Sequence, residues 1–591
     1  MTAVLSDLFV PLLFGGLLLT LLTGFPVAFG LAATGLTFGL LGIQLGLFPS
    51  ALFHALPLRV FGIVQNETLL ALPFFTLMGM LLQRSGIAEE LLETIGQVFG
   101  PLRGGLAFAV IFVGALLAAT TGVVSAAVIS MGLISLPVML RYGYNRSIAT
   151  GVIMASGVLA QIIPPSTVLI VLADQLGRSV GDMYLGALVP GLLLVLVYAV
   201  FIVVLTVVRP NWVPALPQEA RIYREKDGAS GHVSLLVVAL IGAASAYAWT
   251  YLHEGVMNRL LDREGQAPFD EVIVLALTIS GFVILLLALA NRWLRLGLMS
   301  QLCERAMLLL IPPLVLIFLV LGTIFIGVAT PTEAGAMGAV GALVMAIGRR
   351  RLSFSALREA IDSTAQLTCF VMFILIGATV FSFTFNAADG HIWVEHLFSY
   401  LPGGQFGFLM AVSALVFVLG CFLDFFEICF IVVPILAPVA EKMSVDLVWF
   451  GVLIAMNLQT SYLTPPFGFA LFFLRSVAAR RVYTDAVTGK RISAVTTQQI
   501  YSGSIYFVAL QLVMVGILIA YPGLVTDRLE RPKAGNIEQI RIEPERGTYR
   551  DRDDDPMKRS GPGPGAEHDG GASDDDPMER MRRALERDRN K

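Results

Sequence analysis

Long apolar runs recur along the chain, and short polar segments that contain most of its Lys and Arg residues separate them. A run of about 20 apolar residues, wound as a helix, spans the hydrocarbon core of a membrane. Such runs lie near 6–24, 27–48, 68–83, 184–208, 233–252, 271–291, 305–328, 333–349, 363–386 and 500–521. The pattern predicts an all-α polytopic membrane protein.

Four further stretches do not fit a simple span. Residues 106–140 and 405–440 are long enough to cross twice, but only Gly, Thr, Ser or acidic residues lie at their centres, which favours re-entrant hairpins. Residues 147–175 and 447–475 each contain a central Pro-Pro pair. Two prolines remove two backbone donors, so each of these stretches is predicted to be a broken helix.

Short loops rich in Lys and Arg usually face the cytoplasm. These loops lie at 84–103, 141–146, 209–226, 292–305, 349–351 and 475–491. With them inside, the N-terminus is external, and each half of the chain contains three helices, a hairpin, a broken helix and a final helix. The two halves have opposite orientations, as in the inverted repeats of secondary transporters. The alternative is an unrelated string of helices with chance symmetry.

This interpretation divides the chain into four parts. The first repeat is 1–208, and the second is 305–525. Between them, 209–304 is an inserted region with an extra transmembrane pair at 233–291. Residues 526–591 form a charged tail that is predicted to be disordered, although 577–591 could form a short helix.

The composition also indicates a polytopic membrane protein. Hydrophobic residues make up 56% of the chain and charged residues 14%, and residues 527–591 alone hold 15 of the 40 Lys and Arg and 17 of the 43 Asp and Glu. A net charge of −3 with no basic face excludes nucleic acid as a partner. Walker A, HExxH and GxSxG motifs are absent from the sequence, so neither ATP hydrolysis nor hydrolase chemistry is indicated.

Broken helices and hairpin tips place unpaired carbonyls and helix N-termini at membrane depth, where such backbone lines a cavity or binds an ion. Small hydroxyl residues surround them, a set that suits a dehydrated alkali cation better than a transition metal. Helix packing is the alternative role for these positions. The candidate ion ligands are Thr121, Gly122, Ser125, Ser156, Gly157, Gly420, Asp424, Ser461 and Thr464, and the candidate substrate-site residues are Gln161, Pro164, Pro165, Ser166, Asn457, Gln459, Pro465 and Pro466.

Two acids lie within the apolar stretch 405–440. An acid inside a membrane costs several kcal/mol unless it is paired or solvated, so Asp424 is a functional candidate. Asp424 either balances a bound cation or hydrogen-bonds the backbone of the hairpin tip, and the sequence leaves both roles open. Glu427 either caps the following helix or faces water.

Several of these segments together resemble the large membrane subunit (DctM type) of the tripartite ATP-independent periplasmic (TRAP) transporters. The matching segments are TGFPVA at 23–28, LPFFTLMG at 72–79, SGIA at 85–88, RGGLA at 103–107, IPPS at 163–166, TPTEA at 330–334, LD at 423–424 and TPPFG at 464–468. They occur in the family's order.

The resemblance implies an elevator-type transporter of the wider ion-transporter superfamily, located in the bacterial inner membrane. It implies import of an organic acid with sodium as the coupling ion and with no other cofactor. It also implies two separate partner proteins, a small four-helix membrane subunit (DctQ type) and a periplasmic solute-binding protein (DctP type). By this topology the charged tail and the N-terminus are both periplasmic.

The first hairpin tip departs from the family's frequent Ser-Gly-Ser-Ser and reads TGVV at 121–124. This tip and the segment 457–469 resemble the mannitol and chloroaromatic branch, whose members include carriers of 2-oxo acids and lactate. We therefore expect a small organic carboxylate as substrate. The alternatives are a solitary sodium/carboxylate symporter of the same superfamily and, from another class, a membrane-embedded enzyme or assembly scaffold.

Overall fold

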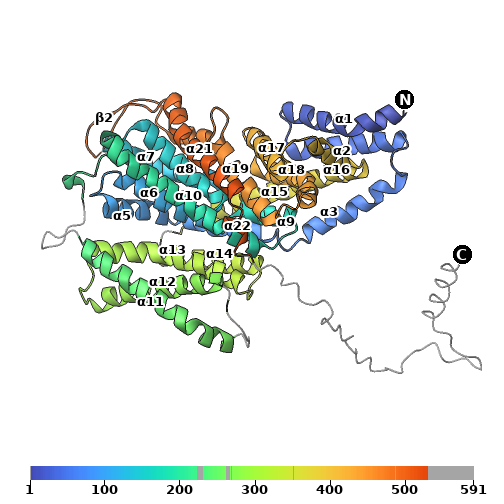
Figure 1. Cartoon of the computed structure of the whole chain (residues 1–591). Coiled ribbons are helices and arrows are strands. Elements are labelled where there is room, and N and C mark those ends of the chain that lie inside the picture. The colour runs from blue at the N-terminus through green and yellow to red at the C-terminus, as the bar shows by residue number, and fades with distance from the viewer. Residues whose placement is uncertain are drawn as a thin grey trace, which may run out of the picture. The chain divides into compact units, whose positions relative to one another are not determined.

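The computed structural model describes residues 2–221, 231–260, 267, 269–350, 352–485 and 487–529. These residues belong to one compact, almost entirely helical unit, 1–529 (Figure 1). Of the tail predicted at 526–591, the structure describes 526–529, and the residues from 530 onward, including the possible helix at 577–591, lie outside the described residues.

The first half contains α1 (Thr2–Leu22), α2 (Val27–Gln44), η1 (Ser50–Ala55), α3 (Leu56–Val64), α4 (Ala71–Arg84), α5 (Ile87–Phe99), α6 (Gly105–Thr121), α7 (Val124–Arg141), α8 (Arg146–Val158), η2 (Leu159–Gln161), α9 (Thr167–Gln175) and α10 (Val180–Val208). Two short 3₁₀ turns follow, η3 (Pro210–Trp212) and η4 (Gln218–Ala220). The inserted pair is α11 (His232–Leu260) and α12 (Phe269–Leu294).

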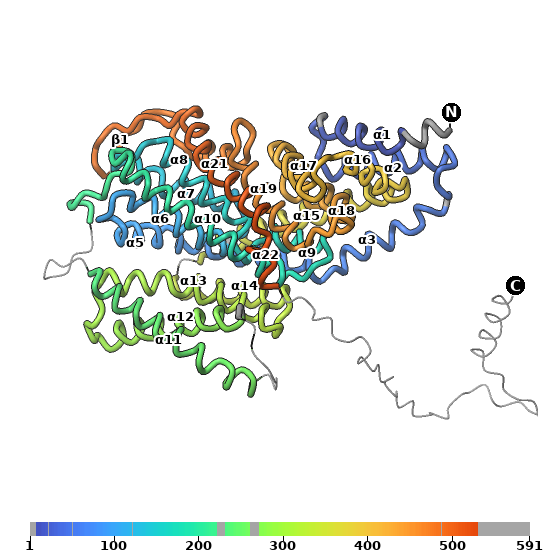
Figure 2. The backbone as a smooth tube through the Cα atoms, in the orientation of Figure 1, coloured from blue at the N-terminus to red at the C-terminus, as the bar shows by residue number. Residues whose placement is uncertain are grey.

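The second half contains α13 (Gln301–Phe325), α14 (Pro331–Gly348), α15 (Phe354–Ala387), α16 (Gly390–Ser399), α17 (Gly404–Leu419), α18 (Phe425–Lys442), α19 (Leu447–Leu463), α20 (Phe469–Val477), α21 (Thr497–Ala520) and α22 (Gly523–Thr526). The two-residue strands β1 (Tyr483–Thr484) and β2 (Arg491–Ile492) pair antiparallel between α20 and α21. Figure 2 follows this path through the chain.

Helices form at all ten predicted spans. In the described part of the chain, nine helices are long and apolar enough to cross a membrane: eight at predicted spans, together with α7, which was predicted as one arm of a hairpin. The helices at the other two predicted spans, α1 and α4, are not among the nine. Both Pro-Pro stretches are broken, between α8 and α9 and between α19 and α20. Both stretches predicted as hairpins divide into two helices, α6 and α7 around Gly122, and α17 and α18 around 420–424.

Four α-helices were not predicted: α3, α5, α16 and the four-residue α22. They are too short to span a membrane, and α5 carries Glu89 and Glu90 in its first turn, so the search for apolar spans passed over them. In addition, α15 begins at Phe354 rather than near 363, because the polar turn with Arg358 and Asp362 continues the helix. Helical segments thus replace much of what we expected to be loop.

Helix pairings repeat with the two halves exchanged. Helix α2 packs along α15, and their counterparts α14 and α4 pack along each other. In the same way α7 packs on α20, while α18 packs on α9. Such exchanged pairs are what a two-fold relation between two repeats requires, so the observed packing agrees with the repeat architecture predicted from the sequence.

Small residues allow close approach in the α2–α15 pair and in a further pair, α8 with α21. A Cβ on Gly377 of α15 would lie 2.3 Å from the Ala28 carbonyl of α2, and a Cβ on Gly503 of α21 would lie 2.1 Å from the Ser147 carbonyl of α8. At both positions only glycine lets the two backbones meet, which is a common way to pack helices in a membrane. Across α8 and α21, the Ser147 and Ser502 hydroxyls also lie 2.9 Å apart.

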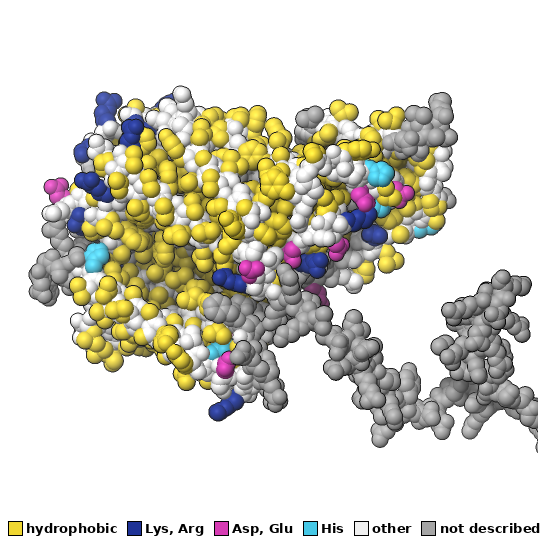
Figure 3. All heavy atoms as spheres, in the orientation of Figure 1, with side chains coloured by type: hydrophobic (Ala, Val, Ile, Leu, Met, Phe, Trp, Pro, Cys, Tyr) yellow, Lys and Arg dark blue, Asp and Glu magenta, His cyan; other side chains and the backbone are white. Residues whose placement is uncertain are grey.

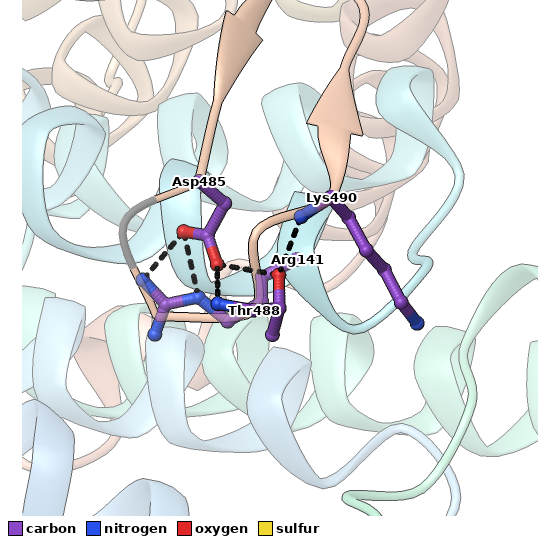
Figure 4. A network of polar contacts seen from close by, with 4 residues as sticks. All are labelled: Arg141, Asp485, Thr488 and Lys490. Carbon is purple, nitrogen blue, oxygen red and sulfur yellow. Dashed lines mark hydrogen bonds and ion pairs between the residues drawn. The ribbon is translucent and has the colours of Figure 1, made fainter.

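The loop between α20 and α21 is anchored to the end of α7. Arg141 donates from Nε (3.0 Å) and Nη2 (2.9 Å) to one oxygen of Asp485, while the Thr488 amide and hydroxyl donate to the other oxygen at 2.8 and 2.6 Å (Figure 4). The hydrogen bonds from Thr488, together with those from Arg141, lower the pKa of Asp485 to about 2. The network ties an element of the second half to the first hairpin.

Asp485→Asn is expected to lower the thermal unfolding midpoint at pH 7, because it removes the charge that pairs with Arg141. A carboxylate with a depressed pKa stabilises the fold above its unfolded pKa of about 3.9 and loses that effect as the pH falls towards 2. The gap between wild type and variant should therefore shrink below pH 4. A gap that stays constant from pH 7 to pH 3 would contradict this role.

Apolar side chains cover most of the visible face of the described unit (Figure 3). Lys and Arg side chains cluster along its left edge, the edge at which the strands β1 and β2 lie (Figure 1). An apolar belt with a basic end is typical of a protein embedded in a bilayer.

Candidate functional site

The first hairpin tip meets the first helix break through Gly122 and Thr167. Gly122 ends α6 with a left-handed φ of +58°, and its carbonyl accepts a hydrogen bond of 2.9 Å from the Thr167 hydroxyl at the start of α9. A Cβ on Gly122 would lie 3.2 Å from the Thr167 methyl group. The tip and the start of the second half-helix are thus in direct contact.

The remaining candidates of this tip are less well defined. Ser125 lies in the first turn of α7 and is half-buried. Thr121 is the last residue of α6, and its side chain lies outside the described part of the structure.

Ser156 and Gly157 are not at the tip, contrary to the grouping predicted from the sequence. Ser156 packs against Gly114 in the middle of α6, where a Cβ would lie 2.4 Å from the serine Cβ, and its hydroxyl donates to the Val152 carbonyl at 2.8 Å. Gly157 packs against Val128 of α7. The two residues therefore contact the arms of the hairpin, as helix-packing residues do.

The first break, 162–166, is completely buried and contains the cis bond Pro164-Pro165. The Ser166 hydroxyl donates to the Gln161 carbonyl at 2.9 Å and so closes the break. The Gln161 side chain is 0% exposed, and neither its amide nitrogen nor its amide oxygen has a hydrogen-bond partner among the described residues. A buried, unpaired polar group costs about 1–3 kcal/mol, so this amide is available to a ligand.

Asp424 caps the second half of the second hairpin. Its carboxylate accepts from the Phe425 amide at 2.7 Å and from the Tyr462 hydroxyl, and the Asp424 amide donates to the Glu427 carboxylate at 3.0 Å. The pair forms a capping box at the start of α18. Of the two roles left open by the sequence, these contacts favour the one in which Asp424 orders the tip.

Two further candidates of the second half, Gly420 and Ser461, contact each other. A Cβ on Gly420 at the tip would lie 2.8 Å from the Ser461 side chain of α19, so these two residues touch. The Thr464 hydroxyl donates to the Thr460 carbonyl at 2.9 Å, at the edge of the break. Asn457, one turn before Ser461, donates to the Ser413 carbonyl of α17 at 2.9 Å.

The second break differs from the first in exposure. It contains the cis bond Pro465-Pro466 and is partly open, with Phe467 48% exposed. The Phe467 ring lies 5.0 Å from that of Phe422, which is 62% exposed at the hairpin tip. The exposed aromatic pair joins the second tip to its break.

Gln459 is fully buried, and its amide is unpaired among the described residues. The Tyr198 side chain of α10 lies next to Gln459 and accepts a 2.6 Å hydrogen bond from Gln511 of α21. Gln459 therefore belongs to a polar cluster between helices and has a different environment from Gln161.

Two contact residues were missed by the sequence interpretation, Thr167 and Tyr462. Thr167 follows directly after the predicted IPPS segment, and Tyr462 lies inside the predicted broken helix, so each was next to a named candidate. A hydroxyl within one helical turn of a helix break is the signal that would have found both. Among the described residues there is no group of three His, Cys, Asp or Glu side chains that could hold a metal ion.

Two hairpins and two broken helices, joined through tips that contact the breaks, define a membrane transporter. Comparison with known proteins then gives the family. A family model of the tripartite ATP-independent periplasmic transporter, DctM component, matches residues 14–524. The chain therefore belongs to the DctM family of transporter permeases, and it is not an enzyme.

Individual relatives agree with the family. The chain is 27% identical over 449 residues to a C4-dicarboxylate TRAP transporter large permease protein from Pseudomonas aeruginosa, covering 76% of this chain and 84% of the relative. It is 24% identical over 458 residues to a sialic acid TRAP transporter large permease protein from Vibrio cholerae, covering 77% and 87%.

Among solved structures, a YdaH transporter from Alcanivorax borkumensis matches with 16% identity and a TM-score of 0.43, covering 78% of this chain and 87% of that one. The family assignment rests on the family model rather than on this structural likeness.

Proposed function

We propose that this chain is the large transmembrane subunit of a TRAP transporter that imports a small organic carboxylate with a sodium gradient. The observation that carries the proposal is the unpaired amide of Gln161 at the buried first break. Its NH₂ group can donate to a carboxylate oxygen, and its carbonyl oxygen is a hard ligand for an alkali cation.

The charge around the first break favours binding of a cation and an anion together. Residues 118–128 and 148–173 contain no charged side chain. A lone anion or a lone cation at this depth would be an unbalanced charge in an apolar surrounding, which is costly. A sodium ion and a carboxylate together neutralise each other, so each improves the binding of the other. This reciprocal coupling is the basis of symport.

At the first site, we propose that Gly122, Ser125 and Thr121 supply oxygens for sodium at the tip, with Thr167 added by its contact with Gly122. At the second site, Gly420, Ser461 and Thr464 supply neutral oxygens, and Asp424 orders the tip through its capping contacts. The N-terminal end of α9, which follows Ser166, then helps to hold the carboxylate.

Helix packing supports an elevator movement. The hairpins and broken helices are interlocked, since α7 packs on α20 and α9 on α18. The network between Arg141 and Asp485 joins them again at the surface. We propose that α6–α10 and α17–α22 move as one body against a scaffold built on the close pairs α2 with α15 and α4 with α14.

The substrate proposal is a 2-oxo acid, lactate or a similar small carboxylate, on the basis of the TGVV tip and its likeness to the mannitol and chloroaromatic branch. Two of the relatives are named for C4-dicarboxylate and sialic acid, which also carry carboxylates. We place the chain in the bacterial inner membrane, with the N-terminus and the tail periplasmic, on the Lys and Arg distribution of its loops.

The TRAP family works with a small membrane subunit and a periplasmic binding protein. We propose that both act here as separate chains, although one relative, from Oleidesulfovibrio alaskensis, is named as a DctMQ permease protein. Reconstitution in liposomes tests this: uptake of a labelled carboxylate should require all three proteins. Uptake by the chain alone would instead support a solitary symporter of the same superfamily.

A further inference from the structure

A cleft of about 960 Å³ lies away from the breaks, between α5, α12, α13 and α14. Its inner walls are apolar and include Leu285 and Leu289 of α12, Pro312 of α13 and Met345 of α14. This volume is at the upper end of the range usual for small-molecule sites. Because α12 belongs to the inserted pair, the insertion itself builds one wall of the cleft.

One end of the cleft is polar. The side chains there include Arg292 at the end of α12 and Arg305 in the first turns of α13. Arg349, just after α14, pairs with Glu90 of α5 at 2.7 Å and also donates to the Leu308 carbonyl at 3.2 Å. The second acid, Glu304, accepts a 2.6 Å hydrogen bond from Asn291.

Both acids at this end of the cleft thus have partners. The lining has three arginines and only two acids. Arg292 is exposed and makes no hydrogen bond or ion pair within the described residues. The polar end of the cleft therefore carries positive charge that the described residues leave unbalanced, which complements an anion.

Helix termini mark where the mouth of the cleft lies. Helices α12 and α14 end there, at Leu294 and Gly348, while α5 and α13 begin there, at Ile87 and Gln301. Helices α12, α13 and α14 are all long and apolar enough to span a membrane, so their common ends lie at a boundary between lipid and water. The charged end of the cleft is at that boundary, and its apolar walls run into the bilayer.

We propose that this cleft binds one anionic phospholipid, with its phosphate at Arg292 and Arg305 and an acyl chain along Leu285, Leu289 and Pro312. Basic pockets between transmembrane helices recognise anionic headgroups in this way. A free phosphate would use the arginines but leave the apolar walls uncovered. The bound lipid would fix the inserted pair α11 and α12 to the remainder of the scaffold.

The test uses the full chain, purified in detergent and depleted of lipid, then titrated with phosphatidylglycerol or with phosphatidylcholine of the same acyl chains. The readouts are the lipid retained in native mass spectrometry and the thermal unfolding midpoint. We expect phosphatidylglycerol to bind more tightly and to raise the midpoint more. Arg292→Gln should weaken phosphatidylglycerol binding about fivefold, which corresponds to ~1 kcal/mol for one basic side chain at a membrane surface.

Arg295→Gln is the matched control, because Arg295 follows the same helix but does not line the cleft. It should leave binding unchanged. Leu289→Trp, which fills the apolar part without changing charge, should also reduce retention, and inorganic phosphate should not displace the lipid. Equal binding of the two lipids, equal effects of the two arginine variants, or displacement by inorganic phosphate would overturn the proposal.

A protein partner is the competing occupant of the cleft. If a helix of the small membrane subunit filled it, Leu289→Trp would abolish co-purification with that subunit and leave lipid retention unchanged. That result would also overturn the proposal. Because these measurements need neither transport nor sodium, they are independent of the proposed function.

Discussion

Replacing Gln161 by leucine should reduce carboxylate uptake at least tenfold while leaving the thermal unfolding midpoint unchanged or slightly higher. The loss follows because a hydrogen bond to a charged group contributes about 1.5–3 kcal/mol, or roughly 10–100-fold in binding. Stability should not fall, because the amide has no partner among the described residues and leucine has a similar volume. Uptake is measured in liposomes with both partner proteins present.

Gln511→Leu is the matched control. Gln511 is also a fully buried glutamine, but its amide donates to Tyr198 at 2.6 Å, and it lies on α21 rather than at a break. This variant should lose about 1 kcal/mol of stability and retain uptake per folded molecule. The opposite pattern, with normal uptake by Gln161→Leu and none by Gln511→Leu, would show that the carboxylate does not bind at Gln161.

The second large effect is expected at Asp424. Asp424→Ala removes the cap of α18 together with the acceptor of the Phe425 amide and the Tyr462 hydroxyl. It should lower stability by about 1–2 kcal/mol and reduce uptake more than tenfold, because the tip loses its fixed geometry. Asp424→Asn keeps an acceptor oxygen and a good capping residue, so it should retain uptake within about threefold of wild type.

Asp446→Ala controls for the general effect of losing a cap. Asp446 caps α19 through the Val448 and Trp449 amides at 2.9 and 3.0 Å, at the end of that helix opposite the break. It should cost similar stability without the loss of uptake per folded molecule. If Asp424→Asn were as inactive as Asp424→Ala, the negative charge itself would be required, and Asp424 would be a cation ligand rather than a cap.

Local sequence predicted the elements that define the class. The ten apolar spans and the two Pro-Pro breaks each follow from the composition of a single segment, and helices form or break accordingly. Two of the candidate ion ligands, Gly420 and Ser461, also contact each other. Gln161 was named as a substrate-site candidate in the broken helix, and its side chain is buried and unpaired among the described residues.

The register between elements could not be predicted in the same way. Ser156 lies near Pro164 in sequence, yet it packs on Gly114, two turns below the tip at Gly122. The register of α8 against α6 depends on how their small residues interlock. This interlocking is set by packing between segments that are distant in sequence. For the same reason the contact of Thr167 with Gly122 was missed.

The central claim, that sodium and a carboxylate are carried together, is tested most directly by uptake into liposomes that contain the chain and both partner proteins. A labelled carboxylate is supplied with sodium outside only, with sodium equal on both sides, or with potassium in its place. We expect accumulation only with the inward sodium gradient and loss of that accumulation in Gln161→Leu. Equal uptake in potassium, or uptake that persists when the sodium gradient is abolished, would contradict it.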